Sequence, residues 1–250
     1  MFDPAQPVSV RNMPPWDQLE FVRLGGGVGY NFLVMHEGVP IGAYKPRDNS
    51  HAIRDEVSAW AADNQMLGLD LVPYTREWVG PHGRGTLQEY VPNNGPCFDY
   101  RNPQGQALAV FDYVMSHGDR HYLNALRRAD VPGGIAAIDN EGILHSPNPE
   151  RGNAMRSNAI AQNFDQPLDP RLIEHLRTVD PERFSEFLQS LDYPASAADW
   201  AALRLAEIQE HGKITGEAWG AAIVNEQFKM VYPPGYAHLY DYIEDLPRTE

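Results

Sequence analysis

The sequence predicts an α+β protein with two lobes, in which a β-rich N-terminal lobe precedes a mostly helical C-terminal lobe. Short apolar segments separated by glycine and proline turns dominate the chain up to about residue 91, which is typical of strands. From about residue 170 onward the apolar residues recur every three or four positions, which is the period of helices. A chain of 250 residues buries one or two cores, so its length fits two lobes and no larger architecture.

The composition excludes several classes of protein. Hydrophobic residues make up 42% of the chain and charged residues 22%, which are the proportions of an ordered globular protein. The formal net charge is −14 at pH 7 and no segment gathers Lys and Arg, so neither nucleic acid nor an anionic membrane is an expected partner. Nothing in the composition indicates the oligomeric state.

A single cysteine, Cys97, rules out an intrachain disulfide and a zinc site built from cysteines. The first sixteen residues contain no apolar segment of the kind that signal peptides have, and no apolar run is long enough to cross a membrane. We therefore expect a soluble, cytoplasmic protein.

The first part of the chain is expected to form a β-hairpin behind a glycine-rich loop. Residues 1–18 hold four prolines and are expected to be an extended lead-in. A strand over "LEFVRL" (19–24) is followed by the glycine-rich "GGGVG" (25–29). The dipeptide "EG" then connects two strands, 30–36 and 39–45, as a tight turn.

A helix is expected to follow, capped at Asn49 or Ser50 and ending before Gly68, which supplies a C-terminal stop. Its apolar residues recur at three and four positions, so one face is buried. Two further strands, 71–79 and 85–91, complete the N-terminal lobe.

The polar segment "PNNGP" (92–96) is the expected boundary between an N-lobe of residues 19–92 and a C-lobe of residues 93–250. In the C-lobe, a helix over 104–116 precedes a polar loop and a strand–turn–strand that ends at Asp139. Further helices are expected over 184–191, 196–211 and 214–230.

The glycines of the first loop are Gly25, Gly26, Gly27 and Gly29, and they allow backbone N–H groups to approach a phosphate because glycine has no Cβ. The loop lacks the GK[ST] ending of a P-loop and no helix follows it, so neither a P-loop nor a Rossmann site fits. Two interpretations stay open, a phosphate-binding loop and a plain turn between strands.

Lys45 and Glu56 form a candidate ion pair. Glu56 lies on the same helical face as the apolar Ile53 and Trp60, so it points inward, where an unpaired carboxylate is costly. Lys45 ends the adjacent strand and is the natural partner of that carboxylate. The alternative is that Glu56 reaches the solvent and Lys45 is a solvated residue at the edge of the sheet.

The segment "HGDRHYLN" (117–124) gathers ionisable and polar side chains in a loop. Asp119 and Asn124 are five positions apart, and Asp139 follows the next strand–turn–strand. Carboxylate and amide oxygens are the ligands that Mg²⁺ prefers, together with water and phosphate. With the glycine-rich loop and the Lys–Glu pair before them, these residues indicate a site for a metal ion and phosphate groups.

These motifs carry a resemblance to a known family. The spacing of Asp119 and Asn124 resembles the D-x-x-x-x-N of the protein-kinase catalytic loop. "GDRHYLN" followed by "AID" resembles the G-D-R-H-x-x-N…D signature of the phosphoinositide 3-/4-kinase family, and "AYKPRDNSHAIRDEVSAW" resembles its small actinobacterial members. "DN" at Asp139 is similar to the D-N-G of four-jointed-type secretory kinases. The resemblance covers about residues 20–145 and leaves the last 100 residues unmatched.

The resemblance implies an atypical protein-kinase-like fold that uses ATP with Mg²⁺, or Mn²⁺ in its place. It implies that Asp119, Arg120 and His121 are catalytic residues, with Asp119 as the catalytic aspartate and His121 assisting proton transfer or stabilising phosphate charge. Asn124 and Asp139 would be the metal ligands. The remaining implied residues bind ATP: Lys45 and Glu56 position its phosphates, and the backbone of Gln88, Glu89, Tyr90 and Val91 forms the hinge that binds adenine.

Departures from the family pattern narrow the expected activity. The sequence has no D-F-G phenylalanine, its glycines do not follow G-x-G-x-x-G, and it lacks a basic activation loop, which weakens a phosphoinositide substrate. The leading hypothesis is transfer of the γ-phosphoryl group of ATP to a hydroxyl of a protein or small molecule. Transfer of AMP on the same fold, or a nucleotide-binding pseudokinase that acts as an interaction module, are the alternatives.

Overall fold

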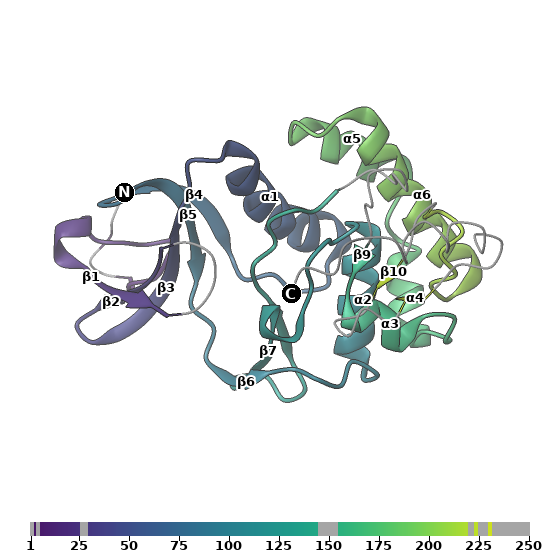
Figure 1. The fold of residues 1–250 in the computed structure, drawn as a ribbon, viewed down its shortest axis with the longest axis horizontal. Coiled ribbons are helices and arrows are strands. Elements are labelled where there is room, and N and C mark those ends of the chain that lie inside the picture. Colours follow the sequence, from purple (N-terminus) through teal and green to yellow (C-terminus); the bar gives the residue numbers. More distant parts are fainter. Residues whose placement is uncertain are drawn as a thin grey trace.

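A computed structural model describes residues 3, 6–25, 30–144 and 155–219, and the backbone of the strand residues 223–224 and 230–231. An antiparallel sheet forms the N-terminal part and helices dominate the C-terminal part, so the predicted α+β fold with two lobes is confirmed. Figure 1 shows the sheet at one end, the helices α3–α6 at the other, and helix α1 between them. No helix in the described ranges is long and apolar enough to cross a bilayer.

The N-lobe is built on a five-stranded antiparallel sheet with the order β1-β2-β3-β5-β4. The strands are β1 (Glu20–Leu24), β2 (Asn31–His36), β3 (Val39–Pro46), β4 (Thr75–Gly80) and β5 (Gly83–Glu89). The β2–β3 turn has the left-handed Glu37–Gly38 pair that a tight hairpin requires. The register places Lys45 of β3 opposite Thr86 of β5, in the middle of the sheet.

Helix α1 (Ser50–Ala61) follows β3 and contacts β4 and β5. The side chain of Asn49 caps it by accepting the backbone N–H of His51 (2.9 Å). The helix continues as a π-helical segment, Ala62–Leu67, and ends at Gly68, whose φ of +63° is left-handed. The glycine stop that the sequence predicts therefore lies where it was expected.

The segment before the sheet differs from the extended lead-in that the prolines suggest. Asn12 ties it into a compact turn, because its amide nitrogen donates to the carbonyls of Asp3, Gln6 and Pro7. Val10 is fully buried in the core of the N-lobe, and a short 3₁₀ helix (Trp16–Gln18) leads into β1. The segment is thus a packed part of the N-lobe.

The C-lobe begins with a second, three-stranded antiparallel sheet, β6-β7-β8. It consists of β6 (Asn93–Pro96), β7 (Ala125–Arg128) and β8 (Ile135–Ala137). Helix α2 (Pro103–Val114) packs against β8, and a 3₁₀ turn, η3 (Tyr122–Asn124), leads into β7. The sequence predicts no strand at β6, because its residues belong to the polar segment expected to separate the lobes.

The rest of the C-lobe is mostly helical: α3 (Asn158–Asn163), α4 (Pro170–Leu176), α5 (Pro181–Ser190) and α6 (Ala195–His211). A small third sheet joins β9 (Met155–Arg156), β10 (Ile223–Val224) and β11 (Met230–Val231). The predicted helix over 214–230 is therefore wrong. The carboxylate of Glu207 accepts the backbone N–H groups of Thr215, Gly216 and Ala218, and these bonds hold the chain in a turn.

Candidate active site

Lys45 joins three separate elements of the fold. It lies on β3, and its ammonium forms an ion pair with Glu56 of α1. The same Nζ atom lies 2.9 Å from Oδ1 of Asp139, which follows β8 in the C-lobe. Lys45 and Glu56 are buried, while the side chain of Asp139 stays 45% exposed. The two lobes are therefore linked by charge at a carboxylate that a ligand can still reach.

The charges of this cluster support one another. Burial lowers the pKa of Lys45, but Glu56 and Asp139 outweigh that effect and hold it above its ordinary value. Burial raises the pKa of Asp139, but Lys45 and then Arg47 outweigh it and hold that carboxyl below its usual range. Lys45 is thus a cation and Asp139 an anion at neutral pH, as binding of phosphate and a metal ion requires.

Asp139 has a left-handed backbone, with φ of +57°. Such a conformation is uncommon for a residue with a side chain and costs about 1–3 kcal/mol, so the surrounding contacts must hold it. Arg120 donates to both neighbours of Asp139. It donates to the backbone carbonyl of Ile138 and to the side-chain oxygen of Asn140. The hydrogen bonds to the residues on either side thus fix the backbone that carries the Asp139 carboxylate.

Glu141 belongs to the same cluster, although the sequence reasoning did not include it. Oxygen atoms of Glu56, Asp139 and Glu141 lie within 4.8 Å of one another. Arg47 donates to Glu141 (2.6 Å), and burial raises the pKa of Glu141 despite that cation. Oε2 of Glu56 is buried and has no hydrogen-bond partner among the residues that the structure describes. A second acidic residue two positions after Asp139 was the signal that could have revealed Glu141.

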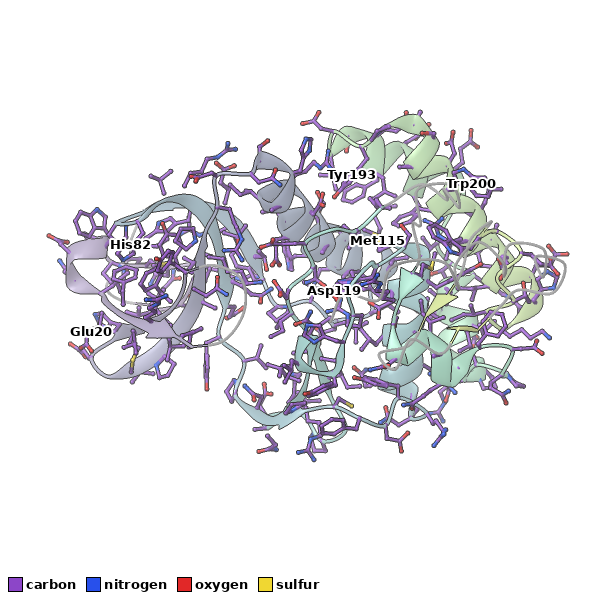
Figure 2. The ribbon with its side chains drawn as sticks, viewed as in Figure 1. Glu20, His82, Met115, Asp119, Tyr193 and Trp200 are labelled. Atoms are coloured by element: carbon purple, nitrogen blue, oxygen red, sulfur yellow. The ribbon has the colours of Figure 1, made fainter. Side chains whose placement is uncertain are left out.

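Asp119 lies between the sheet and the helical part of the molecule (Figure 2), and its side chain is exposed. Its carboxylate has no hydrogen-bond partner among the described residues, so it is free to accept a proton from an incoming group. Its backbone is fixed on both sides: its N–H donates to Nδ1 of His117 (3.1 Å) and its carbonyl accepts from Nδ2 of Asn124 (3.0 Å). His117 is thus a positioning residue that the sequence reasoning missed.

The Asn124 amide is oriented by the same bond. Because Nδ2 donates to the Asp119 carbonyl, the side-chain oxygen Oδ1 remains as an acceptor. The backbone carbonyl of Asn124 accepts from the N–H of Ile138 (3.0 Å), next to Asp139. The structure therefore brings together the backbones of the two residues expected to be metal ligands.

Arg120 has a different role from the catalytic one expected for it. Its side chain is fully buried, with Nε donating to Asp112 (3.0 Å) and the outer nitrogens to the carbonyls of Asn124 (2.8 Å) and Ile138 (2.6 Å) and to Oδ1 of Asn140 (2.5 Å). The other carboxylate oxygen of Asp112, Oδ2, accepts a hydrogen bond from the hydroxyl of Ser157 (2.7 Å). A guanidinium with its donors engaged inside the protein cannot contact a substrate, so we revise its assignment to positioning.

His121 begins the η3 turn, and its ring lies edge-on to that of Tyr122, with 6.3 Å between the ring centres. Its backbone N–H donates to the Asp119 carbonyl (3.0 Å). The ring is half-buried, and no hydrogen bond or ion pair joins it to the Asp119 carboxylate within the described residues.

The hinge segment has fewer available groups than the sequence reasoning assumed. The side chain of Gln88 donates to Thr75 (2.9 Å), and the backbone N–H groups of Glu89 and Tyr90 donate to the carbonyls of Tyr74, just before β4, and of Ile41 in β3. Within the described part of the chain, the N–H of Val91 donates to no protein acceptor. Of the segment expected to be the hinge, Val91 therefore keeps a backbone amide that is available to a ligand.

Gly25 is the only glycine of the glycine-rich loop inside the described residues; Gly26, Gly27 and Gly29 lie outside them. A Cβ added at Gly25 would meet no atom within 4 Å, so packing does not require glycine there. Whether the loop binds phosphate stays a prediction.

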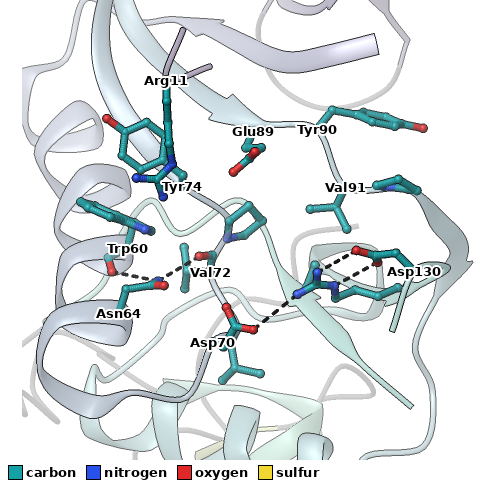
Figure 3. Close-up of a pocket in the computed structure, with 15 residues that line it drawn as sticks. Arg11, Trp60, Asn64, Asp70, Val72, Tyr74, Glu89, Tyr90, Val91 and Asp130 are labelled. Carbon is teal, nitrogen blue, oxygen red and sulfur yellow. Dashed lines mark hydrogen bonds and ion pairs between the residues drawn. The ribbon is translucent and has the colours of Figure 1, made fainter. Parts of the chain in front are cut away.

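A cavity of about 230 Å³ lies at the expected hinge (Figure 3). Its lining includes Trp60 and Tyr74, and the guanidinium of Arg11 lies 3.8 Å from the centre of the Tyr74 ring. Glu89 and Val91 also line it. Lys45, Asp119 and Asp139 do not, so of the candidate site residues only those of the expected hinge line this cavity.

The described part of the chain thus combines an antiparallel N-terminal sheet, an ion pair between a strand lysine and a helix glutamate, and a mostly helical C-terminal part. Among solved structures, the chain is similar to the Helicobacter pylori proinflammatory kinase CtkA, with a TM-score of 0.41 and 12% sequence identity, covering 78% of this chain and 93% of that chain. No protein-family model matches the chain, and neither does any curated protein. We therefore base the proposed function on the contacts of the site residues.

Proposed function

We propose that the protein is an ATP- and Mg²⁺-dependent phosphotransferase that moves the γ-phosphoryl group of ATP to a hydroxyl of a protein or small-molecule acceptor. One observation carries the proposal: the buried ammonium of Lys45 contacts both Glu56 of α1 and Asp139 of the C-lobe. A lysine that only stabilises the fold needs a single carboxylate as its partner. A lysine placed between two carboxylates, one of them left accessible, is the arrangement that receives phosphate oxygens and a metal ion side by side.

Each residue has a role that its surroundings allow. Lys45, held by Glu56, neutralises the α- and β-phosphates. The exposed Asp119 accepts or orients the hydroxyl proton of the acceptor, which is why a carboxylate without a protein partner suits the position. Val91 offers its backbone N–H to the adenine. In-line phosphoryl transfer depends on positioning and charge neutralisation more than on covalent chemistry, and these residues supply both.

The donor set fits a magnesium ion. Asp139 supplies an ionised carboxylate and Asn124 an amide oxygen, and both are hard oxygen ligands, which Mg²⁺ prefers, with Mn²⁺ as a substitute. The neighbouring Glu141 adds a third oxygen donor within reach. When bound, the ion would screen the charge that develops on the phosphate oxygens.

Incubation with ATP labelled at the α or the γ position, in the presence of a cell extract, tests the proposal. Label transferred from the γ position alone, and lost in Asp139→Asn, is the expected result. Transfer from the α position would instead assign AMP transfer. Binding of ATP without transfer of either label would assign a pseudokinase, and absence of ATP binding would overturn the proposal.

A further inference from the structure

Asp55 lies next to Glu56 on α1 and contacts two separate parts of the C-lobe. Its Oδ2 accepts the backbone N–H of Gly142 (3.1 Å), and its Oδ1 accepts the hydroxyl of Tyr193 (2.7 Å). Gly142 lies three residues after Asp139, and Tyr193 lies in the turn between α5 and α6. One carboxylate therefore joins the helix that bears Glu56, the loop that bears Asp139 and the C-terminal helices.

These contacts are shielded from water. Asp55 and Tyr193 are both buried, at 6% and 5% exposure, so their hydrogen bond does not compete with solvent. Arg54 covers the pair, because its guanidinium lies 4.1 Å from the centre of the Tyr193 ring and donates to the carbonyl of Asp192 (3.2 Å). Burial and the charge of Asp55 raise the pKa of Tyr193, so its hydroxyl keeps the proton that it donates.

We infer that Asp55 and Tyr193 are positioning residues that hold helix α1 in the orientation that brings Glu56 to Lys45. The inference rests on the proposed function, since it names what fixes the geometry of the same site. Adjacent residues of a helix move together, so a helix held at Asp55 cannot carry Glu56 away from Lys45. The turn between α5 and α6 thus acts on the site through one buried carboxylate.

A matched pair of variants separates this role from general stability. Tyr193→Phe removes the hydroxyl that binds Asp55. Tyr113→Phe removes a buried hydroxyl that binds a carboxylate elsewhere, Glu207 on α6 (2.6 Å). The two substitutions delete the same atom from the same kind of hydrogen bond, so each should lower the melting temperature by a similar amount.

Two readouts are compared, the kcat of phosphoryl transfer and amide hydrogen exchange in peptides covering 50–61 and 139–144. We expect Tyr193→Phe to lower kcat roughly tenfold and to speed exchange in both peptides, because a loosened helix less often reaches the reactive geometry. Tyr113→Phe should leave both readouts close to wild type. Asp55→Asn, which cannot accept both bonds, should behave like Tyr193→Phe and replaces it if that variant does not fold.

The two readouts distinguish the failure of the inference from the failure of the proposed function. Equal effects of Tyr193→Phe and Tyr113→Phe on exchange in both peptides would overturn the inference whether or not the protein transfers phosphate. If the wild type shows no transfer but Tyr193→Phe alone loosens the two peptides, the contact holds the helix as inferred and the proposed function is wrong. Faster amide exchange in Tyr193→Phe without a change in kcat would show that the contact between Asp55 and Tyr193 does not position the site for transfer.

Discussion

The ammonium of Lys45 lies 2.9 Å from the carboxylate of Asp139, although 94 residues separate the two in the chain. The same ammonium is paired with Glu56, so one buried cation holds a strand, a helix and a loop in a fixed arrangement. The charge of this residue therefore stabilises the contact between the two lobes.

Replacement of Lys45 by Met should abolish transfer and destabilise the fold. It leaves the buried carboxylate of Glu56 without a counter-charge, and breaking a buried pair in this way costs about 3–5 kcal/mol. The double variant Lys45→Met/Glu56→Gln should regain much of that stability, because the fully buried charge is removed and the carboxylate of Asp139 is partly exposed to water, but should stay inactive. Urea unfolding and the transfer assay measure the two effects. Recovery of activity in the double variant would show that Lys45 has no role beyond structure.

Asp119→Asn should lower kcat by at least about 100-fold, because an amide cannot accept the proton of the acceptor hydroxyl. Its unfolding free energy should change by less than about 0.5 kcal/mol, since the exposed side chain has no partner among the described residues. The exposed Asp17 offers a matched control, and Asp17→Asn should leave both quantities unchanged. Wild-type turnover in Asp119→Asn would show that Asp119 does not accept the proton of the acceptor hydroxyl.

Arg120→Lys should impair the protein although the charge is kept. A lysine ammonium cannot span Asp112, the carbonyls of Asn124 and Ile138, and Asn140 at once. We expect a loss of about 2–4 kcal/mol in unfolding free energy, together with weaker Mg²⁺ dependence of transfer. A variant that keeps wild-type stability and metal dependence would show that the buried guanidinium does not position the two ligands.

Asp63, in the π-helical segment after α1, should make stability depend on pH. Burial raises its pKa from 3.8 to about 6, although its Oδ2 accepts the N–H groups of Leu71 and Val72 (both 2.7 Å). Because the folded pKa lies above the unfolded one, the protonated form favours folding. Its contribution is complete below pH 3.8 and is lost as the pH rises through about 6.

Protonation of Asp63 contributes as much as about 3 kcal/mol to the unfolding free energy at low pH. Urea unfolding of wild type and Asp63→Asn across this range isolates it, because the variant keeps the shape and cannot titrate. The difference between the two unfolding free energies should change steadily between pH 4 and about 7. A difference that is constant with pH would show that Asp63 keeps an ordinary pKa in the folded protein.

The elements of the N-lobe could be predicted because their signals are local. Alternating apolar residues and the Glu37–Gly38 turn define β2 and β3, and Gly68 ends the helical region in the left-handed conformation that few other residues tolerate. Strand β6 could not be predicted, because "NNGP" has little strand propensity and becomes a strand only through pairing with β7. The turn after α6 was missed for a similar reason, since a distant carboxylate, that of Glu207, holds it.

Some contacts of the candidate site could likewise be predicted from local sequence signals, and others could not. The pairing of Lys45 with Glu56 could be inferred, because helical periodicity alone turns Glu56 toward the sheet. The position of Arg120 could not, because a charged residue in a polar loop is expected at the surface, and only the folded chain supplies Asp112 and Asn140 to satisfy it. The contact of Asp55 with Tyr193 spans 138 residues and leaves no trace in either local segment.

Calorimetric titration with ATP, with and without Mg²⁺, tests the central claim most directly in wild type and Asp139→Asn. We expect Mg²⁺ to strengthen ATP binding to the wild type at least about tenfold, and Asp139→Asn to keep metal-free binding but lose most of that gain, since one ligand of the ion is gone. Absence of ATP binding, or a full Mg²⁺ effect in Asp139→Asn, would contradict the assignment of this cluster as the nucleotide and metal site.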